Sequence, residues 1–226
     1  MSELFIGIDL AWGDKNQSGF AVLELGSKGE LNVLDIELIH SLDDIADEIL
    51  KYKNHNIHIG IDAPIVVPNE TGNREIEKEF NKEFAKYKIS MLPINRTLLK
   101  KYSKNIRSEE LYKKLSVDFK NIFEVYPHST IAVCFNNYKI LPYKRKKGRG
   151  VEFIKEQLVI YQNYLLDVIF THLILQQNIK DLKGARLKEY EDRLDAITCA
   201  YTLYYCKYNK HKIYQLDSID RFITPI

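Results

Sequence analysis

The stretch "GIDLAWGDKN", residues 7–16, places an aspartate at the end of an apolar run. The residues before it, from Leu4 to Ile8, have the apolar pattern of a buried β-strand, and Asp9 ends that pattern just before a turn. Burying a carboxylate costs several kcal/mol unless a cation or hydrogen-bond donors compensate for the lost water. The sequence therefore predicts a compensating group beside Asp9.

Three more carboxylates interrupt apolar patterns in the same way. Asp62 ends the run "IGIDAP", Glu124 lies within "FEVYP", and Asp195 lies within "RLDAITCA". Side chains at the carboxyl ends of parallel strands converge on one crevice of an α/β sheet. We therefore expect Asp9 and Asp62 to be neighbours although they are far apart in the sequence.

The last of these segments predicts a helix with a second acidic residue, Asp192, on the same face as Asp195. Carboxylates that are crowded together repel one another unless a divalent cation lies between them. Oxygen ligands of this kind suit Mg²⁺ or Mn²⁺. The sequence thus predicts metal ligands at Asp9, Asp62, Asp192 and Asp195, and it predicts catalytic carboxylates at Asp9, Asp62, Glu124 and Asp195.

Four of these five carboxylates also have a purely structural interpretation. Asp9 fits a turn former, and Asp62 fits a residue that ends a strand. Glu124 fits a partner of an arginine such as Arg74, and Asp192 fits an exposed helix residue with a lysine partner. The functional interpretation is favoured because a single fold would bring all of these exceptions together.

The order of the apolar patterns predicts the fold class. Strands are expected at residues 3–11, 18–25, 31–39, 56–64 and 121–129. Helices are expected at residues 41–53, 74–88, 108–116, 151–177 and 186–207. Residues 211–226 leave room for a short edge strand and a tail. This order predicts an α/β fold of the ribonuclease H-like class, a mixed five-stranded sheet (β-β-β-α-β-α-β-α) with helices on both faces.

The chain is expected to form one domain over residues 1–226, with a helical insertion at about 65–120 between the fourth and fifth strands. Its 226 residues are 45% hydrophobic and 28% charged, which is typical of a globular protein and excludes a disordered one. No apolar run reaches the length of a membrane span. The first residues lack the features of a signal peptide, so a cytoplasmic location is expected.

A basic segment, "YKRKKGRG", gives the clearest sign of a binding partner. Net charge is only +2, but cations crowd into this segment, and such local clusters favour contacts with phosphates. The sequence therefore predicts nucleic acid, DNA or RNA, as the partner, and it leaves the oligomeric state open, a homodimer included. The predicted nucleic-acid-binding residues are Lys144, Arg145, Lys146, Lys147 and Arg149.

Five short motifs carry a family resemblance. They are "GIDLAWG" (7–13), "IDAP" (61–64), "EVYP" (124–127), "YKRKKGR" (143–149) and "EDRLDAITCA" (191–200). In these motifs and their order the chain resembles the domain of unknown function 429 family, described as predicted nucleases with a ribonuclease H-like fold. The resemblance implies metal ligands at Asp9, Asp62 and Asp195, with Asp192 as a further closing ligand. Glu124 belongs to the family motif without a counterpart in ribonuclease H. The closing motif, Asp-x-x-Asp-Ala, is also similar to that of Holliday-junction resolvases.

The leading functional hypothesis is a nuclease that hydrolyses phosphodiester bonds with two carboxylate-held metal ions. A catalytically silent nucleic-acid-binding or scaffold protein of the same fold is the alternative. A phosphotransferase of the actin and sugar-kinase type is less favoured. The first turn lacks the small residues that a phosphate turn needs, and 226 residues do not readily hold that fold's two duplicated halves.

Overall fold

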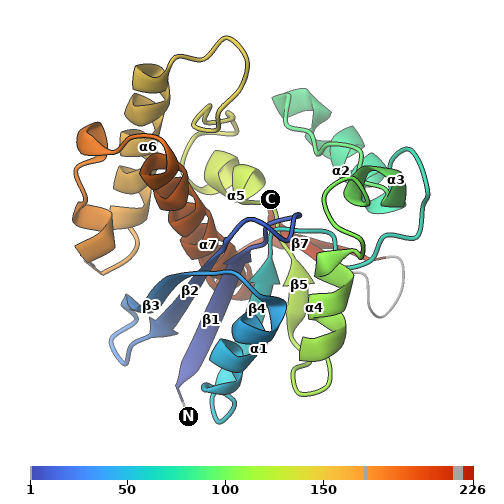
Figure 1. Ribbon diagram of the computed structural model, residues 1–226. Coiled ribbons are helices and arrows are strands. Elements are labelled where there is room, and N and C mark those ends of the chain that lie inside the picture. The colour runs from blue at the N-terminus through green and yellow to red at the C-terminus, as the bar shows by residue number, and fades with distance from the viewer. Residues whose placement is uncertain (1, 171–172, 216–220) are drawn as a thin grey trace.

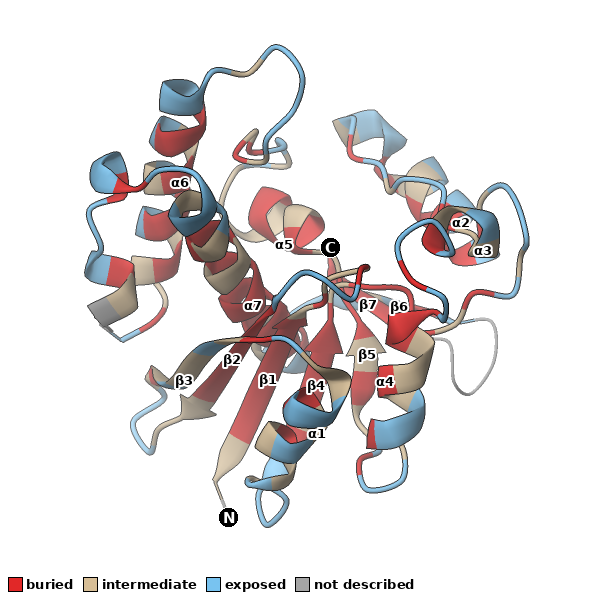
Figure 2. Ribbon diagram, in the orientation of Figure 1, coloured by how far each residue is buried: buried red, intermediate tan, exposed pale blue. Residues whose placement is uncertain are grey.

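The alternating residues of the first strand separate the two faces of the sheet. In β1 (Glu3–Asp9), Leu4 and Ile6 pack into one hydrophobic cluster and Phe5 packs into another on the opposite side. Successive side chains of a strand point to opposite faces, so a strand that is apolar at every position must be covered on both sides. β1 is accordingly a central strand, buried along most of its length (Figure 2).

The computed structural model describes residues 2–170, 173–215 and 221–226. In these residues seven strands form one sheet in the order β3-β2-β1-β4-β5-β7-β6 (Figure 1). β1, β2 and β3 are antiparallel to one another in turn, β4, β5 and β7 run parallel to β1, and β6 is antiparallel to β7. The strands after β1 are β2 (Ser18–Leu25), β3 (Leu31–Ile39), β4 (Asn56–Ile61), β5 (Ile122–Glu124), β6 (His211–Gln215) and β7 (Arg221–Pro225).

Helices cover both faces of this sheet, as the sequence predicts (Figure 1). The helices are α1 (Leu42–Leu50), α2 (Glu75–Phe84), α3 (Arg96–Leu99), α4 (Arg107–Leu115), α5 (Pro127–Cys134), α6 (Val151–Leu166) and α7 (Ala185–Tyr208). Single 3₁₀ turns lie at Ala85–Tyr87, Leu173–Gln176 and Ile179–Asp181. Apolar residues of α6 and α7 join the cluster of Phe5, whereas those of α1 and α4 join the cluster of Leu4 and Ile6. The coarse prediction of a mixed α/β protein is confirmed.

The prediction of five strands is wrong, because the C-terminal segment adds two strands to the sheet. β7 lies parallel to β5 at Phe222, and β6 pairs with β7. Tyr214 and Phe222 from these strands pack against Phe80 of α2. The pairing of β7 with β5 joins segments about a hundred residues apart in the sequence, so no local pattern predicts it. Residues 216–220 of the expected tail lie outside the described residues.

Among the predicted elements that end earlier than expected, a strand and a helix differ most clearly. The strand expected at 121–129 ends at Glu124, and Pro127 begins α5 instead of ending the strand. Proline is favoured at the first helical position because the amide hydrogen it lacks has no partner there. The helix expected at 151–177 ends at Leu166, where the chain turns so that the Phe170 amide donates to the Leu31 carbonyl at 2.8 Å. Residues 171–172 of that expected helix lie outside the described residues.

Candidate functional site

The parallel strands β1, β4 and β5 end at the same edge of the sheet and bring three of the predicted carboxylates together. Asp9 ends β1, Asp62 follows β4, and Glu124 ends β5. All three line one pocket with a volume of about 300 Å³. The convergence expected from the sheet rule is therefore present. Asp9 and Asp62 are half-buried and face the pocket, whereas Glu124 is 2% exposed.

The helix α7 brings the fourth carboxylate to this edge, and glycines in the sheet make its approach possible. A methyl group at Gly7 would overlap the backbone carbonyl of Ala196, and one at Gly60 would lie 2.9 Å from the Cys199 carbonyl. Gly7 and Gly60 are register partners on β1 and β4. Each glycine therefore lets α7 lie directly on the sheet two residues before a pocket aspartate.

Asp195 of α7 is fully buried and is held by donors from this chain. The Tyr143 hydroxyl donates to its Oδ1 at 2.7 Å, and the Tyr161 hydroxyl lies 3.0 Å from the same oxygen. Its Oδ2 lies 2.9 Å from the Lys144 ammonium. Burial disfavours the charged carboxylate, but Lys144 and the Tyr143 hydroxyl outweigh that effect, and the pKa of Asp195 is lowered. Asp195 is therefore an ionised carboxylate whose Oδ1 is hydrogen-bonded and whose Oδ2 is ion-paired.

Lys144 lines the pocket, and its ammonium is shared among several carboxylates. Burial disfavours the charged amine, but Asp195, Asp9 and Asp62 together hold the pKa of Lys144 well above its usual range. The side chain stays 34% exposed, so it also faces the pocket. Lys144 therefore stays protonated between the buried Asp195 and the pocket.

The two pocket aspartates resist ionisation. Burial raises the pKa of Asp9 well above its usual range, against the attraction of Lys144, and Asp195 and Asp62 add repulsion. Burial likewise raises the pKa of Asp62 to about 7, again against Lys144, with Asp195 and Glu124 adding repulsion. The charge of Lys144 is thus too small to stabilise the ionised forms of Asp9 and Asp62 fully. The pocket therefore favours the binding of additional positive charge.

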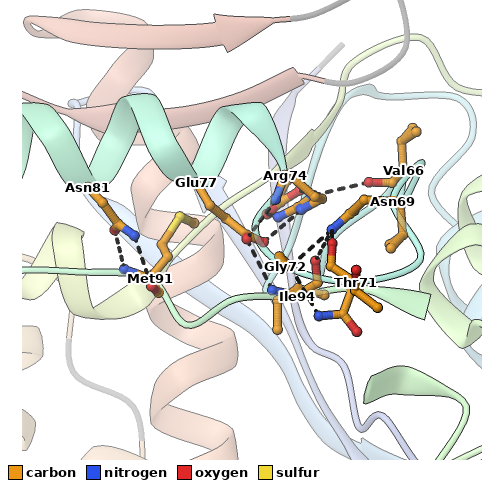
Figure 3. Close-up of polar contacts among 12 residues, drawn as sticks. Val66, Asn69, Thr71, Gly72, Arg74, Glu77, Asn81, Met91 and Ile94 are labelled. Atoms are coloured by element: carbon orange, nitrogen blue, oxygen red, sulfur yellow. Dashed lines mark hydrogen bonds and ion pairs between the residues drawn. The ribbon is translucent and has the colours of Figure 1, made fainter. Parts of the chain in front are cut away.

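Glu124 belongs to a different network, the arginine pair that the structural interpretation expected. Both Arg74 terminal nitrogens bond its carboxylate, at 2.8 and 2.6 Å, while Arg74 Nε bonds Glu77 at 2.8 Å. Glu77 also accepts from the Ile94 amide, and Arg74 donates to the Val66 carbonyl (Figure 3). Arg74 and its two carboxylates are almost completely buried. Glu124 therefore has a structural partner on both of its oxygens.

Asp192 also has the lysine partner of its structural interpretation. Its carboxylate pairs with Lys188 one turn earlier on α7, and Lys188 also contacts Glu191 at 3.1 Å. Asp192 and Asp9 line a second pocket, of about 580 Å³, which does not include Asp62 among its lining residues. The predicted pair of closing ligands is thus divided, because Asp195 faces Lys144 and Asp192 faces Lys188.

The predicted metal ligands do not form one cluster of three or more side chains within the described residues. Among the residues that the structure describes, no group of three or more histidine, cysteine, aspartate or glutamate side chains is arranged to hold a metal ion. The reason is visible at Asp195, where Tyr143, Tyr161 and Lys144 occupy the positions around the carboxylate. Asp9 and Asp62 line the pocket, and no side chain of the described part of the chain hydrogen-bonds either carboxylate.

A comparison with family models gives the family of the chain. The model described as "Protein of unknown function (DUF429)" matches residues 7–210. The chain belongs to this family. The match begins at Gly7 and ends just after α7, so it contains both pockets and leaves out β6 and β7. No curated protein and no solved structure matches the chain.

Within the DUF429 match, the pocket contains residues that the sequence patterns did not reveal. His128 lines it beside Tyr126, and burial followed by the nearby Lys144 lowers the pKa of His128 to about 3, so its ring is neutral. Its Nδ1 has no hydrogen-bond partner within the described residues. Glu77 was also missed, although its place three residues after Arg74 at the start of α2 is a recognisable signal.

The basic segment of the DUF429 match divides into two parts. Arg145, Lys146 and Lys147 are exposed. Lys144 turns inward to Asp195, and Arg149 donates to the Lys144 carbonyl at 2.9 Å. The structure thus leaves three of the five predicted phosphate-contacting cations at the surface. Over the described residues, no helix has both the length and the apolarity to cross a membrane.

Proposed function

We propose that the protein is a divalent-metal-dependent nuclease that hydrolyses phosphodiester bonds of nucleic acid. The observation that carries the proposal is the charge of the pocket: Asp9, Asp62 and Asp195 surround the ammonium of Lys144, and Lys188 adds only a smaller attraction at Asp62. Full ionisation of the three carboxylates would leave two negative charges unbalanced in a partly buried site, which is why the pKa values of Asp9 and Asp62 are raised in the metal-free protein. One divalent cation would supply the missing charge.

The strand order supports the same proposal. The antiparallel meander of β1, β2 and β3, which leads into the parallel strands β4 and β5, is consistent with the element order predicted for the ribonuclease H-like class. β7 and β6 extend that sheet beyond β5. Members of the family that the chain resembles are described as predicted nucleases, and the proposal takes that description over to this pocket.

The donor set fits a hard divalent cation at one place. Asp9 and Asp62 offer carboxylate oxygens that no described side chain bonds, and both face the pocket. Oxygen donors of this type are preferred by Mg²⁺ and Mn²⁺. These two residues would therefore hold the ion, with Asp195 behind Lys144.

The proposed hydrolysis gives a role to the bound ion, to the lysine of the pocket and to the exposed cations beside it. The bound ion would supply Lewis acidity toward a phosphoryl oxygen and make water a better nucleophile at neutral pH. Lys144 attracts a phosphate to the pocket, and the exposed Arg145, Lys146 and Lys147 contact neighbouring phosphates. Glu124 stays bound to Arg74 and lines the pocket. A cytoplasmic location and a nucleic-acid partner are part of this proposal.

The test compares wild type with Asp62→Asn and with Asp118→Asn, which changes an exposed aspartate outside both pockets. Labelled single-stranded and duplex DNA, RNA and RNA–DNA hybrids are incubated with Mn²⁺, Mg²⁺ or EDTA. We expect cleavage only with metal, a loss of about 100-fold or more in Asp62→Asn, and no change in Asp118→Asn. Wild type that cuts none of these substrates, or cuts equally well in EDTA, contradicts the proposal.

A second candidate function is a catalytically silent nucleic-acid-binding protein. The observation that favours it is Lys144, which already neutralises Asp195 without a metal. Metal-independent binding of the same nucleic acids, with no cleavage under any of these conditions, would support this alternative.

A further inference from the structure

We propose that the Lys144 ammonium takes one of the two cation positions of the carboxylate cluster, so that the protein binds a single divalent ion, between Asp9 and Asp62. The inference rests on the proposed function, because it specifies how many ions the same site holds. A two-ion site needs carboxylates that bridge both ions and leave oxygens free for each.

Asp195 already has partners within the chain. Its Oδ1 accepts from the Tyr143 hydroxyl at 2.7 Å, and its Oδ2 forms an ion pair with the Lys144 ammonium at 2.9 Å. The side chain is 0% exposed. A metal ion at Asp195 would have to displace the ammonium from its buried partner. Asp195 therefore already has its cation.

The position of Lys144 is set by its surroundings. Its neighbour Tyr143 is fully buried, and the Tyr143 ring lies 4.7 Å from that of Tyr161 and 5.0 Å from that of His128. The Arg149 side chain donates to the Lys144 backbone carbonyl. The backbone that carries the ammonium is thus anchored on both sides. Lys144 is therefore a built-in part of the cluster.

The remaining carboxylates, Asp9 and Asp62, are the pair that would hold the ion. Asp9 and Asp62 line the pocket, and no side chain of the described residues bonds or ion-pairs with either carboxylate. When both ionise on binding a cation, their two charges match the charge of one divalent ion. Lys144 lines the same pocket, so its ammonium and the first ion would together repel a second ion.

The test counts Mn²⁺ ions bound by the full chain, by calorimetric titration and by electron paramagnetic resonance of free Mn²⁺. We expect one ion for wild type and two for Lys144→Met, which keeps the length of the side chain and removes its charge. Lys139→Met, which changes an exposed lysine earlier in the same connecting segment, should bind one ion. Asp62→Asn should lose the single ion.

The outcomes separate this inference from the proposed function. Two ions on wild type, or one ion on a folded Lys144→Met, overturn the lysine inference and leave a metal-dependent nuclease in place. No ion on wild type overturns the proposed function itself. Where Lys144→Met does not fold, the resonance spectrum of Mn²⁺ bound to wild type decides. An isolated ion supports the inference, and an exchange-coupled pair overturns it.

Discussion

Single carboxylates of the pocket differ in what neutralises them. Glu124 and Glu77 share Arg74, and Asp195 has Lys144 and two tyrosines. Asp9 and Asp62 share Lys144 with Asp195, Lys188 attracts Asp62 more weakly, and the pKa values of both aspartates are raised by burial above all. The first group is stable without any ligand, whereas the second gains from a cation. This division separates residues that support the fold from those proposed to hold a metal.

Replacing Arg74 with methionine should strongly destabilise the protein. The change leaves two buried carboxylates without their cation, and removing one member of a buried ion pair costs about 3–5 kcal/mol. Urea unfolding followed by circular dichroism measures the loss. Lys78→Met is the control, since Lys78 pairs with Glu75 at the surface and such pairs contribute about 0–1 kcal/mol. A loss below about 1 kcal/mol in Arg74→Met would contradict a structural role for the network.

The raised pKa of Asp62 makes the metal-free protein sensitive to pH. Its native-state pKa, about 7, lies above the usual value for an unfolded chain, so the native state holds this proton more tightly. The resulting stabilisation is complete below the unfolded pKa and is lost as pH rises toward 7 and beyond. Asparagine at this position cannot ionise, and it removes this loss.

In EDTA, the melting temperature of Asp62→Asn should therefore rise relative to wild type between pH 5 and pH 8. A change of a few degrees is expected, since about 1 kcal/mol corresponds to about 2–4 °C in a chain of this size. Asp118→Asn should show no such trend. A difference between Asp62→Asn and wild type that stays constant over this range would show that Asp62 ionises normally.

Among the secondary-structure elements, α7 does most to assemble the site. It packs against β1, β2 and β4, and glycines on these strands, Gly7, Gly19 and Gly60, lie under its backbone. The close approach places Asp195 beside the ends of β1 and β4. Each of the motifs "GID" in β1 and at the end of β4 therefore joins a packing glycine to a pocket aspartate two residues later.

Gly7→Ala should push α7 away from the sheet. The new methyl group meets the backbone of α7 at Ala196, which cannot rotate aside, so a loss of about 3 kcal/mol or more is expected, the upper end of the overpacking range. Chemical denaturation measures this loss. Gly150→Ala is the matched control, because its φ is −71° and no atom lies within 4 Å of the added methyl group. Equal stabilities of the two variants would refute the close packing of α7.

In the whole molecule, an acidic pocket lies next to a basic surface segment. Net charge is only +2, so attraction to nucleic acid depends on where the cations lie. The exposed Arg145, Lys146 and Lys147 follow directly after Lys144 of the pocket. A nucleic-acid strand held by these three residues would thus bring one of its phosphates near the carboxylates.

Replacing Arg145, Lys146 and Lys147 with alanine should weaken nucleic-acid binding and flatten its salt dependence. The slope of log K against log salt is negative, and each lost phosphate contact reduces its magnitude by about 0.9 for duplex DNA. Fluorescence anisotropy over a range of salt concentrations measures the slope. The control replaces Lys28 and Lys53, two exposed lysines near the opposite end of β1, and should leave the slope unchanged. A triple variant with the wild-type slope would exclude this segment from the interface.

Local patterns predict much of this protein. The apolar run before Asp9 predicts β1, and Ser41 followed by acidic residues predicts α1, where the Ser41 hydroxyl accepts from the Asp44 amide at 3.0 Å. Aspartates that end apolar strands predict the edge at which the pocket lies. These features are readable because strand alternation, helix periodicity and capping depend on residues only a few positions apart.

Other features depend on contacts that only the folded chain makes. The pairing of β7 with β5, the bond of Glu124 to Arg74 and the ion pair of Lys144 with Asp195 each join residues from separate segments. In sequence, Lys144 is one of five clustered cations and Asp195 is one acidic residue of a helix. Which cation neutralises which carboxylate is decided by the close packing of α7 on the glycines and by the burial of Tyr143. Both depend on the tertiary structure, because electrostatic interactions act through space and take no account of separation along the chain.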